Sequence, residues 1–132
     1  MEQAWLLDVG NCDPDHGMIR RMLTEHFDVR IDRVMFVDEA LEKMRERVYS
    51  LVLFNRLIFD NGSEGIELLR QAKADPALRA TPVMMISNYA DAQKAGVDQG
   101  GEPGFGKNDV GAPLTVLLLA KYLPVKSKQG PR

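Results

Sequence analysis

The chain has 132 residues, of which 45% are hydrophobic, and its 17 lysines and arginines nearly balance 19 aspartates and glutamates. This length suits one domain, and the apolar fraction is sufficient for a core. A net charge of -2 provides no concentrated positive surface, which excludes the usual electrostatic basis for binding nucleic acid or an anionic membrane. The single cysteine, Cys12, excludes an internal disulfide and a cluster of thiolate metal ligands.

The N-terminus shows no basic region, long apolar stretch or small-residue cleavage site, so a secretory signal is not expected. No apolar run approaches the roughly 20 residues that a membrane-spanning helix needs. The sequence therefore predicts a soluble, cytoplasmic domain.

Five short segments have the composition of β-strands. Residues 4–7, 51–54 and 83–86 are continuous apolar runs that are too short for helices. Such runs are typical of strands covered on both faces in a parallel sheet. Residues 29–34 mostly alternate between apolar and polar, which favours a half-exposed edge strand. The glycine-rich residues 104–106 are a weaker candidate for the opposite edge.

Amphipathic segments separate and follow these strands, and the first begins at Asp13-Pro14. Aspartate is expected to cap the helix, and proline in the first turn lacks only an N–H that would be unpaired anyway. His16 is expected in this first turn with its side chain exposed. The apolar face of the helix consists of Ile19, Met22, Leu23 and Phe27.

Four further helices are expected along the chain. Asp38 is expected to cap the second, and the apolar residues of that helix are Leu41, Met44 and Val48. The third follows residues 61–63 and ends before Pro76, because proline cannot continue a helix. Its inward residues are Ile66, Leu69 and Ala72. A short fourth helix is expected to be interrupted at Gly96. The last spans residues 113–122, with an apolar stripe of Val116, Leu117, Ala120 and Leu123.

The alternation of strands and helices predicts a single (βα)5 domain of the α/β class. Right-handed crossovers make it a doubly wound five-stranded parallel sheet in the flavodoxin-like order 2-1-3-4-5. We place the domain at residues 1–124, and residues 125–132 form a polar tail that is expected to be disordered. In such a sheet the functional site lies outside the carboxyl ends of the strands, near the first and third.

Four segments carry a resemblance to a known family. They are residues 49–55, residues 62–69, residues 81–90 and residues 104–107. In this order and with these elements between them, the chain resembles the receiver domain of bacterial response regulators up to about Leu123. The resemblance implies the same fold, and it implies a role in two-component signal transduction.

The resemblance also implies one reaction, in which an aspartate ending the third strand attacks a phosphoryl donor. Acids after the first strand help that aspartate to hold Mg²⁺, while a lysine and a hydroxyl bind the phosphoryl oxygens. Lys107 and Ser87 stand at the lysine and hydroxyl positions. Asn55, however, stands at the aspartate position, and its amide is too poor a nucleophile to form an acyl phosphate.

The acidic pair of the family appears here as Asn11 and Cys12, and Asp13 supplies a carboxylate only if the loop is shifted by one residue. Mg²⁺ binding is therefore expected to be weak or absent, and no other cofactor is expected. Asn108 replaces the usual proline after the lysine, and Gly104 replaces the aromatic residue that changes position on activation. We therefore expect a domain that is neither an enzyme nor phosphorylated by the family mechanism.

The leading interpretation is an atypical receiver, or pseudo-receiver, that signals through protein–protein contact. The resemblance implies a histidine kinase or an output protein as the kind of partner. It also allows a homodimer through the face built by the fourth helix, the fifth strand and the fifth helix. The glycines at 100, 101, 104 and 106 indicate a remodelled and mobile surface there. Neither nucleic acid nor a membrane is expected as a partner.

Two alternatives stay open. The first is a working response regulator that is phosphorylated on a displaced carboxylate, Asp13 or Asp60. The second is a flavodoxin-like binder of a nucleotide or flavin. That function needs a loop of backbone N–H groups after the first strand. Residues 11–15 instead offer two carboxylates and a proline, which disfavours a phosphate.

Within the leading interpretation, two contacts are expected in the site. The amide of Asn55 is expected to hydrogen-bond to Lys107 or Ser87 and fix one conformation. The ammonium of Lys107 needs an acceptor in place of the missing aspartate, and Asp13 and Asp109 are the candidates. Cys12 is expected to be a small buried hydrophobe rather than a reactive thiol.

Overall fold

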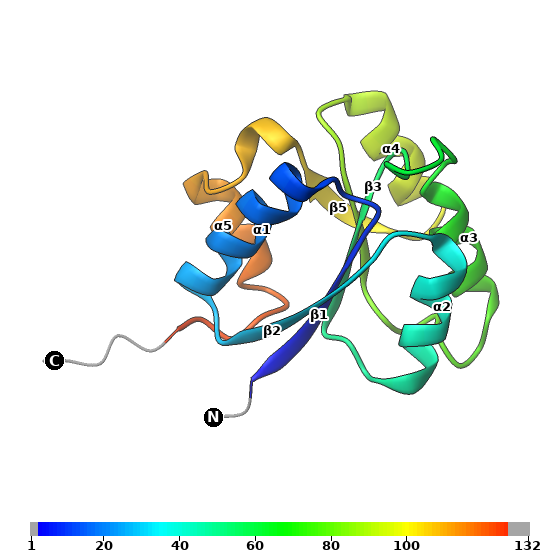
Figure 1. The fold of residues 1–132 in the computed structure, drawn as a ribbon, viewed down its shortest axis with the longest axis horizontal. Coiled ribbons are helices and arrows are strands. Elements are labelled where there is room, and N and C mark those ends of the chain that lie inside the picture. Colours follow the sequence, from blue (N-terminus) through cyan, green and yellow to red (C-terminus); the bar gives the residue numbers. More distant parts are fainter. Residues whose placement is uncertain (1–2, 127–132) are drawn as a thin grey trace, which may run out of the picture.

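A computed structural model describes residues 3–126 of the chain, and Figure 1 shows one sheet with helices on both faces. The strands are β1 (Ala4–Val9), β2 (Val29–Val34), β3 (Leu51–Asn55), β4 (Val83–Ile86) and β5 (Glu102–Phe105). They form a single parallel sheet in the order β2-β1-β3-β4-β5. This arrangement confirms the predicted fold class and strand order.

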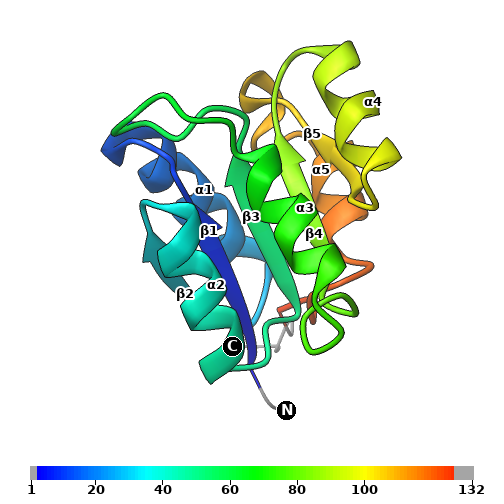
Figure 2. The same ribbon diagram turned by 90° about the vertical axis from the view of Figure 1, so that its right-hand side faces the viewer.

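The helices are α1 (Asp13–His26), α2 (Val37–Glu46), α3 (Ile66–Ala74), α4 (Ala90–Asp98) and α5 (Pro113–Leu119), with a short 3-10 turn η1 (Lys107–Asp109). Helices α1 and α5 cover one face of the sheet, and α2, α3 and α4 cover the other (Figures 1 and 2). None of the helices within residues 3–126 is long and apolar enough to cross a membrane.

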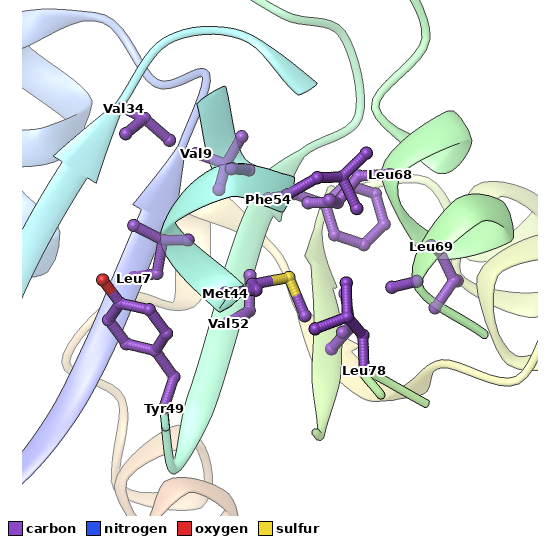
Figure 3. Packing of buried hydrophobic residues seen from close by; sticks show 14 of the residues in the cluster. Leu7, Val9, Val34, Met44, Tyr49, Val52, Phe54, Leu68, Leu69 and Leu78 are labelled. Atoms are coloured by element: carbon purple, nitrogen blue, oxygen red, sulfur yellow. The ribbon is translucent and has the colours of Figure 1, made fainter. Parts of the chain in front are cut away.

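The two faces bury separate apolar clusters because the central strands are apolar on both sides. Residues of β3 alternate between them, so that Val52 and Phe54 face α2 and α3 while Leu51 and Leu53 face α1 and α5. Figure 3 shows the first cluster, in which Met44 of α2 lies against the sheet. Each completely buried Val, Leu or Phe side chain contributes about 1.5–3 kcal/mol to the stability of the fold. The two clusters therefore hold the helices firmly against the sheet.

The first helix has the predicted apolar face, since Ile19, Met22, Leu23 and Phe27 are all buried. The prediction that Asp13 caps it was wrong. Cys12 is the N-cap residue without a side-chain bond, and Asp13 is the first helical residue. The carboxylate of Asp13 pairs with Arg33 of β2 instead, at 2.8 Å.

The second helix begins two residues earlier than predicted, so Asp38 lies within its first turn rather than at the cap. Glu39 Oε1 accepts the backbone N–H groups of Met35 and Phe36, at 3.1 and 3.0 Å, and thereby satisfies donors at the helix start. The helix ends at Glu46, so Val48 lies beyond it and is 87% exposed rather than inward.

The third helix ends before Pro76 as predicted, and Leu69 and Ala72 are buried.

The last helix is shorter than predicted, because it ends at Leu119 and a turn follows. Its apolar stripe was misplaced at one position. Leu119 is buried, whereas Leu117 is 65% exposed.

The chain continues to pack after the last helix. Val125 forms an antiparallel bridge with Phe27, and the backbone N–H of Lys126 donates to the carbonyl of His26 at 2.8 Å. The first residues of the predicted polar tail are thus tied to the end of α1. The remainder of that tail, residues 127–132, lies outside the described residues.

Helix α4 passes through Gly96 without a break and ends at Asp98. Its Gln93 holds the helix to the sheet. Gln93 Nε2 donates to the carbonyls of Met85 and Ser87 at 2.9 and 3.2 Å, and its Oε1 accepts the N–H of Gly104 at 3.0 Å. A Cβ on Gly104 would lie 2.0 Å from the Met85 carbonyl oxygen. Close packing therefore explains the glycine at this position.

We predict that Gln93→Ala lowers the free energy of unfolding by about 2 kcal/mol, because it leaves the partners of the amide without their hydrogen bonds in a part-buried site. Urea unfolding followed by circular dichroism measures this. Gln99→Ala, at the exposed C-terminal end of the same helix, is the control and should change stability by less than about 0.5 kcal/mol. Equal effects in the two variants would contradict the role of Gln93.

Candidate functional site

The carboxyl ends of the strands meet at one edge of the sheet, which lies at the top of Figure 2. Loops following β1, β3, β4 and β5 bring polar side chains together there, as the parallel topology requires. A cavity of about 270 Å³ opens between the last three of these loops. It is lined by Asn55, Arg56, Leu57, Ile86, Ser87, Asn88, Tyr89 and Lys107.

Asn55, the last residue of β3, uses its amide to join two backbone segments. Its Nδ2 donates to the carbonyl of Leu57 at 2.6 Å and, more weakly, to the carbonyl of Gly10 at 3.4 Å. The expected contact with Lys107 or Ser87 was therefore wrong. The short contact to Leu57 arises because the chain turns directly after the strand, and it requires a donor at this position.

Lys107, the first residue of η1, forms an ion pair across the site. Its Nζ lies 2.7 Å from Asp15 Oδ2 of α1. The prediction that Asp13 or Asp109 is the acceptor was therefore wrong. Both side chains are partly buried, with exposed fractions of 32% and 21%. The bond with Lys107 lowers the pKa of the Asp15 carboxyl below its ordinary value, against the desolvation that raises it, and the Cys12 thiol contributes to the lowering.

Ser87 follows β4 and is nearly buried, and its Oγ accepts the backbone N–H of Tyr89 at 3.1 Å. The Arg56 guanidinium lies 5.1 Å from the centre of the Tyr89 ring, within the range of a cation–π contact. Asn88 Oδ1 accepts the N–H of Asn108 at 3.1 Å and so ties the loop after β4 to the loop after β5. The sequence placed these loops together correctly but did not identify Arg56 or Tyr89.

The loop after β1 holds the residues at the position of the acidic pair. Asn11 is completely buried and donates from Nδ2 to Asp8 Oδ1 at 2.6 Å. Arg33 donates from Nη2 to the Asn11 carbonyl at 2.8 Å while it pairs with the exposed Asp13. Cys12 is partly buried. The guanidinium thus places a protein cation at the side of this loop.

Asp8 is a completely buried carboxylate that the sequence analysis did not single out. It accepts from Asn11, and His16 Nδ1 lies 2.6 Å from its second oxygen. His16 is in the first turn of α1 as predicted, but only 16% of its side chain is exposed. The sequence feature that could have revealed this buried carboxylate is a single acid between the apolar residues Leu7 and Val9 of a strand. A buried carboxylate needs a partner, and a histidine eight residues later was available.

Two atoms near this loop lack a hydrogen-bond partner. Asn11 Oδ1 and Arg33 Nε are buried and unbonded within the described chain. Across residues 3–126, no group of three or more His, Cys, Asp or Glu side chains is arranged to hold a metal ion.

Among the comparisons with known proteins, the one with solved structures identifies the fold. No family model and no curated protein matches the sequence. Solved structures do match: a chain from Chloroflexus aurantiacus assigned as a response regulator superposes with a TM-score of 0.78 at 20% identity, over 91% of this chain and 96% of that one. The chain therefore has the receiver-domain fold.

Two further receiver structures show the same likeness. The phosphorylated cyanobacterial phytochrome response regulator RcpA superposes with a TM-score of 0.74 at 16% identity, over 96% of this chain and all of that one. The chemotaxis response regulator CheY4 of Vibrio cholerae gives 0.70 at 16% identity, over 91% and 98% of the two chains. At these low identities the likeness shows the fold alone.

We predict that His16→Ala lowers the free energy of unfolding by about 3 kcal/mol, because breaking a buried pair leaves the Asp8 carboxylate with too few partners. Urea unfolding measures the loss, and His26→Ala on the same helix is the control, with an effect below about 1 kcal/mol. In an Asp8→Asn background the cost of His16→Ala should shrink. An unchanged cost in that background would show that His16 stabilises the protein by packing alone.

A second prediction concerns the ion pair of Lys107 and Asp15. Because its pKa is lowered on folding, Asp15 stabilises the protein above the unfolded carboxyl pKa of about 4, and this contribution is lost as the pH falls through the folded value. Lys107→Met should therefore cost up to about 1 kcal/mol at neutral pH and much less in acid. Urea titrations at both pH values test this, with the exposed Lys121→Met as control. A pH-independent cost would exclude the ion pair as its cause.

Proposed function

We propose that this receiver-fold domain acts in cytoplasmic signal transduction through protein–protein contact, without phosphorylation of an aspartate. The observation that carries the proposal is the state of the site. The amide of Asn55 is bonded to two backbone carbonyls, and Lys107 already has its carboxylate partner in Asp15. The two side chains at the positions that would receive and bind a phosphoryl group are thus each engaged by other groups of the protein.

The environment of Asn55 supports the loss of the nucleophile. A carboxylate at this position would place a negative oxygen against the Leu57 carbonyl, where Nδ2 now donates at 2.6 Å. Oxygen acceptors cannot satisfy each other, so the loop would have to move. The position therefore suits an amide and disfavours an aspartate.

The loop after β1 supports weak or absent Mg²⁺ binding. A hard divalent cation is held by several oxygen ligands, usually with carboxylates among them. Asn11 is neutral, the carboxylate of Asp13 is paired with Arg33, and the carboxylate of Asp8 has two partners of its own. The guanidinium of Arg33 also repels a second cation. We propose that the domain works without a cofactor.

The exposed face of α5 with α4 and β5 supports contact with a protein partner. Leu114 and Leu117 are 79% and 65% exposed, and Val97 of α4 is 42% exposed. Large apolar side chains that stay exposed are typical of interaction surfaces when they gather on one face. We propose a histidine kinase or an output protein as the class of partner, and a homodimer through the same face as one form of the contact.

Incubation with acetyl phosphate and Mg²⁺ tests the absence of phosphorylation. Intact-mass spectrometry should show no stoichiometric adduct on the wild-type protein, with a competent receiver domain as the positive control. A hydroxylamine-sensitive adduct would overturn the proposal. Mapping it would then identify the displaced carboxylate, and Asp15, beside Lys107, is the site to examine first, ahead of the exposed Asp13 and Asp60.

We predict that Asn55→Asp alone fails to restore phosphorylation and lowers the free energy of unfolding by about 1–3 kcal/mol. The new carboxylate faces carbonyl oxygens and still lacks an acidic metal site. The triple variant with Asn11→Asp and Cys12→Asp supplies that site and is the matched comparison in the acetyl phosphate assay. Ready phosphorylation of the single variant would show that the loop after β1 binds Mg²⁺ as it stands.

A further inference from the structure

A groove of about 700 Å³ is lined by residues of α2, of α3 and of the loop before α3. These two helices lie on the opposite side of the sheet from α1 and α5 (Figure 2). One wall comes from the start of α2, with Phe36, Val37 and Leu41. The other comes from the loop before α3 and the outer side of that helix. The helices are neighbours that pack against the same apolar cluster, so the groove is a fixed feature of the fold.

The rim of the groove is acidic. Three carboxylates line it, Asp38, Glu64 and Glu67, and no lysine or arginine does. Glu67 is paired with Arg70. Asp38 and Glu64 form no ion pair with any of residues 3–126 in the structure; Asp38 accepts only the backbone N–H of Glu39, at 3.0 Å.

Of the four cations on the two helices, Arg70 pairs with Glu67 of the rim, and the other three have partners away from Asp38 and Glu64. Arg45 reaches Asp75 at 3.3 Å, and Lys43 approaches Glu46 at 4.0 Å. Lys73 donates to the carbonyls of Arg79 and Thr81, both at 2.9 Å. Two of the three rim carboxylates, Asp38 and Glu64, therefore have no cation partner within the described part of the chain. A bound cation has to come from another molecule.

We propose that this groove binds a cationic peptide segment of a partner protein, in which lysine or arginine flanks a bulky apolar side chain. The apolar side chain contacts Phe36, Val37 and Leu41, and the flanking cations pair with Asp38 and Glu64. An apolar wall beneath an unpaired acidic rim distinguishes this ligand from a small cation, which would gain nothing from the wall. The surface lies apart from the exposed leucines of α5, so it extends the proposed function by a second contact.

The probe is a fluorescein-labelled peptide in which lysines flank two leucines, and its counterpart carries glutamates in place of the lysines. Fluorescence anisotropy at low salt should show binding of the lysine peptide only, weakening as salt rises. The double variant Asp38→Asn, Glu64→Gln should bind about tenfold more weakly, since exposed charge pairs contribute up to about 1 kcal/mol each. Amide NMR shifts should fall on residues 36–41 and 61–71.

The control variant is Asp91→Asn, Glu25→Gln. Asp91 is the second residue of α4 and accepts the N–H of Ala92, just as Asp38 is the second residue of α2 and accepts the N–H of Glu39. Glu25 is exposed on α1. Absence of binding, an equal loss in the control variant, or shifts confined to α4, β5 and α5 would each overturn the proposal. The acetyl phosphate assay is read separately, so either proposal can fail alone.

Discussion

The buried carboxylate of Asp8 sets the conditions for the loop that follows β1. Asp8 lies in a strand paired on both sides, and its side chain is completely removed from water. Burial of an unpaired charge is costly, so the sequence has to deliver donors to both oxygens. Asn11 and His16 supply them from the next residues of the chain. This pairing fixes the direction in which the chain leaves the strand and the position of the first turn of α1.

The ion pairs around the site follow from that placement. With α1 held by His16, its Asp15 lies within reach of Lys107, and its Asp13 lies beside Arg33 of the neighbouring strand. Lys107 and Arg33 therefore each form an ion pair with an acid of α1. The amide of Asn55 links β3 to the same loop by its hydrogen bond to the Gly10 carbonyl. A cation that is already paired inside the protein is less available to stabilise an incoming phosphoryl group, and a paired carboxylate is less available to hold a metal ion.

Much of the fold could be predicted because apolar periodicity depends only on which faces are buried. The bounds of β2 and β4 and the inward face of α1 agree with the sequence pattern. The last helix shows the limit of this reasoning. Four apolar residues in a row at its centre leave the period undefined, and only packing against α1 decides that Leu119 is inward and Leu117 outward. The partner of Lys107 was predicted wrongly as Asp13 or Asp109, because Asp13 and Asp15 both belong to the first turn of α1 and the sequence does not show which of them faces the ammonium. Which of them faces the ammonium depends on the rotation of α1.

The charged side chains Lys107 and Asp15 of the site neutralise each other. A change of conformation in this domain would therefore need a trigger other than phosphorylation of the site. A conformational shift requires a ligand with different affinity for two states, and under the proposed function that ligand is a protein partner rather than a phosphoryl group. The position of α4 relative to the site is also fixed, because Gln93 hydrogen-bonds this helix to β4 and β5. Gly104 has no side chain that could change its orientation. The surfaces, by contrast, keep unpaired acids on one side and exposed leucines on another. Under the proposed function, information is carried by which partner is bound, and the sheet places the two surfaces on different sides of the domain.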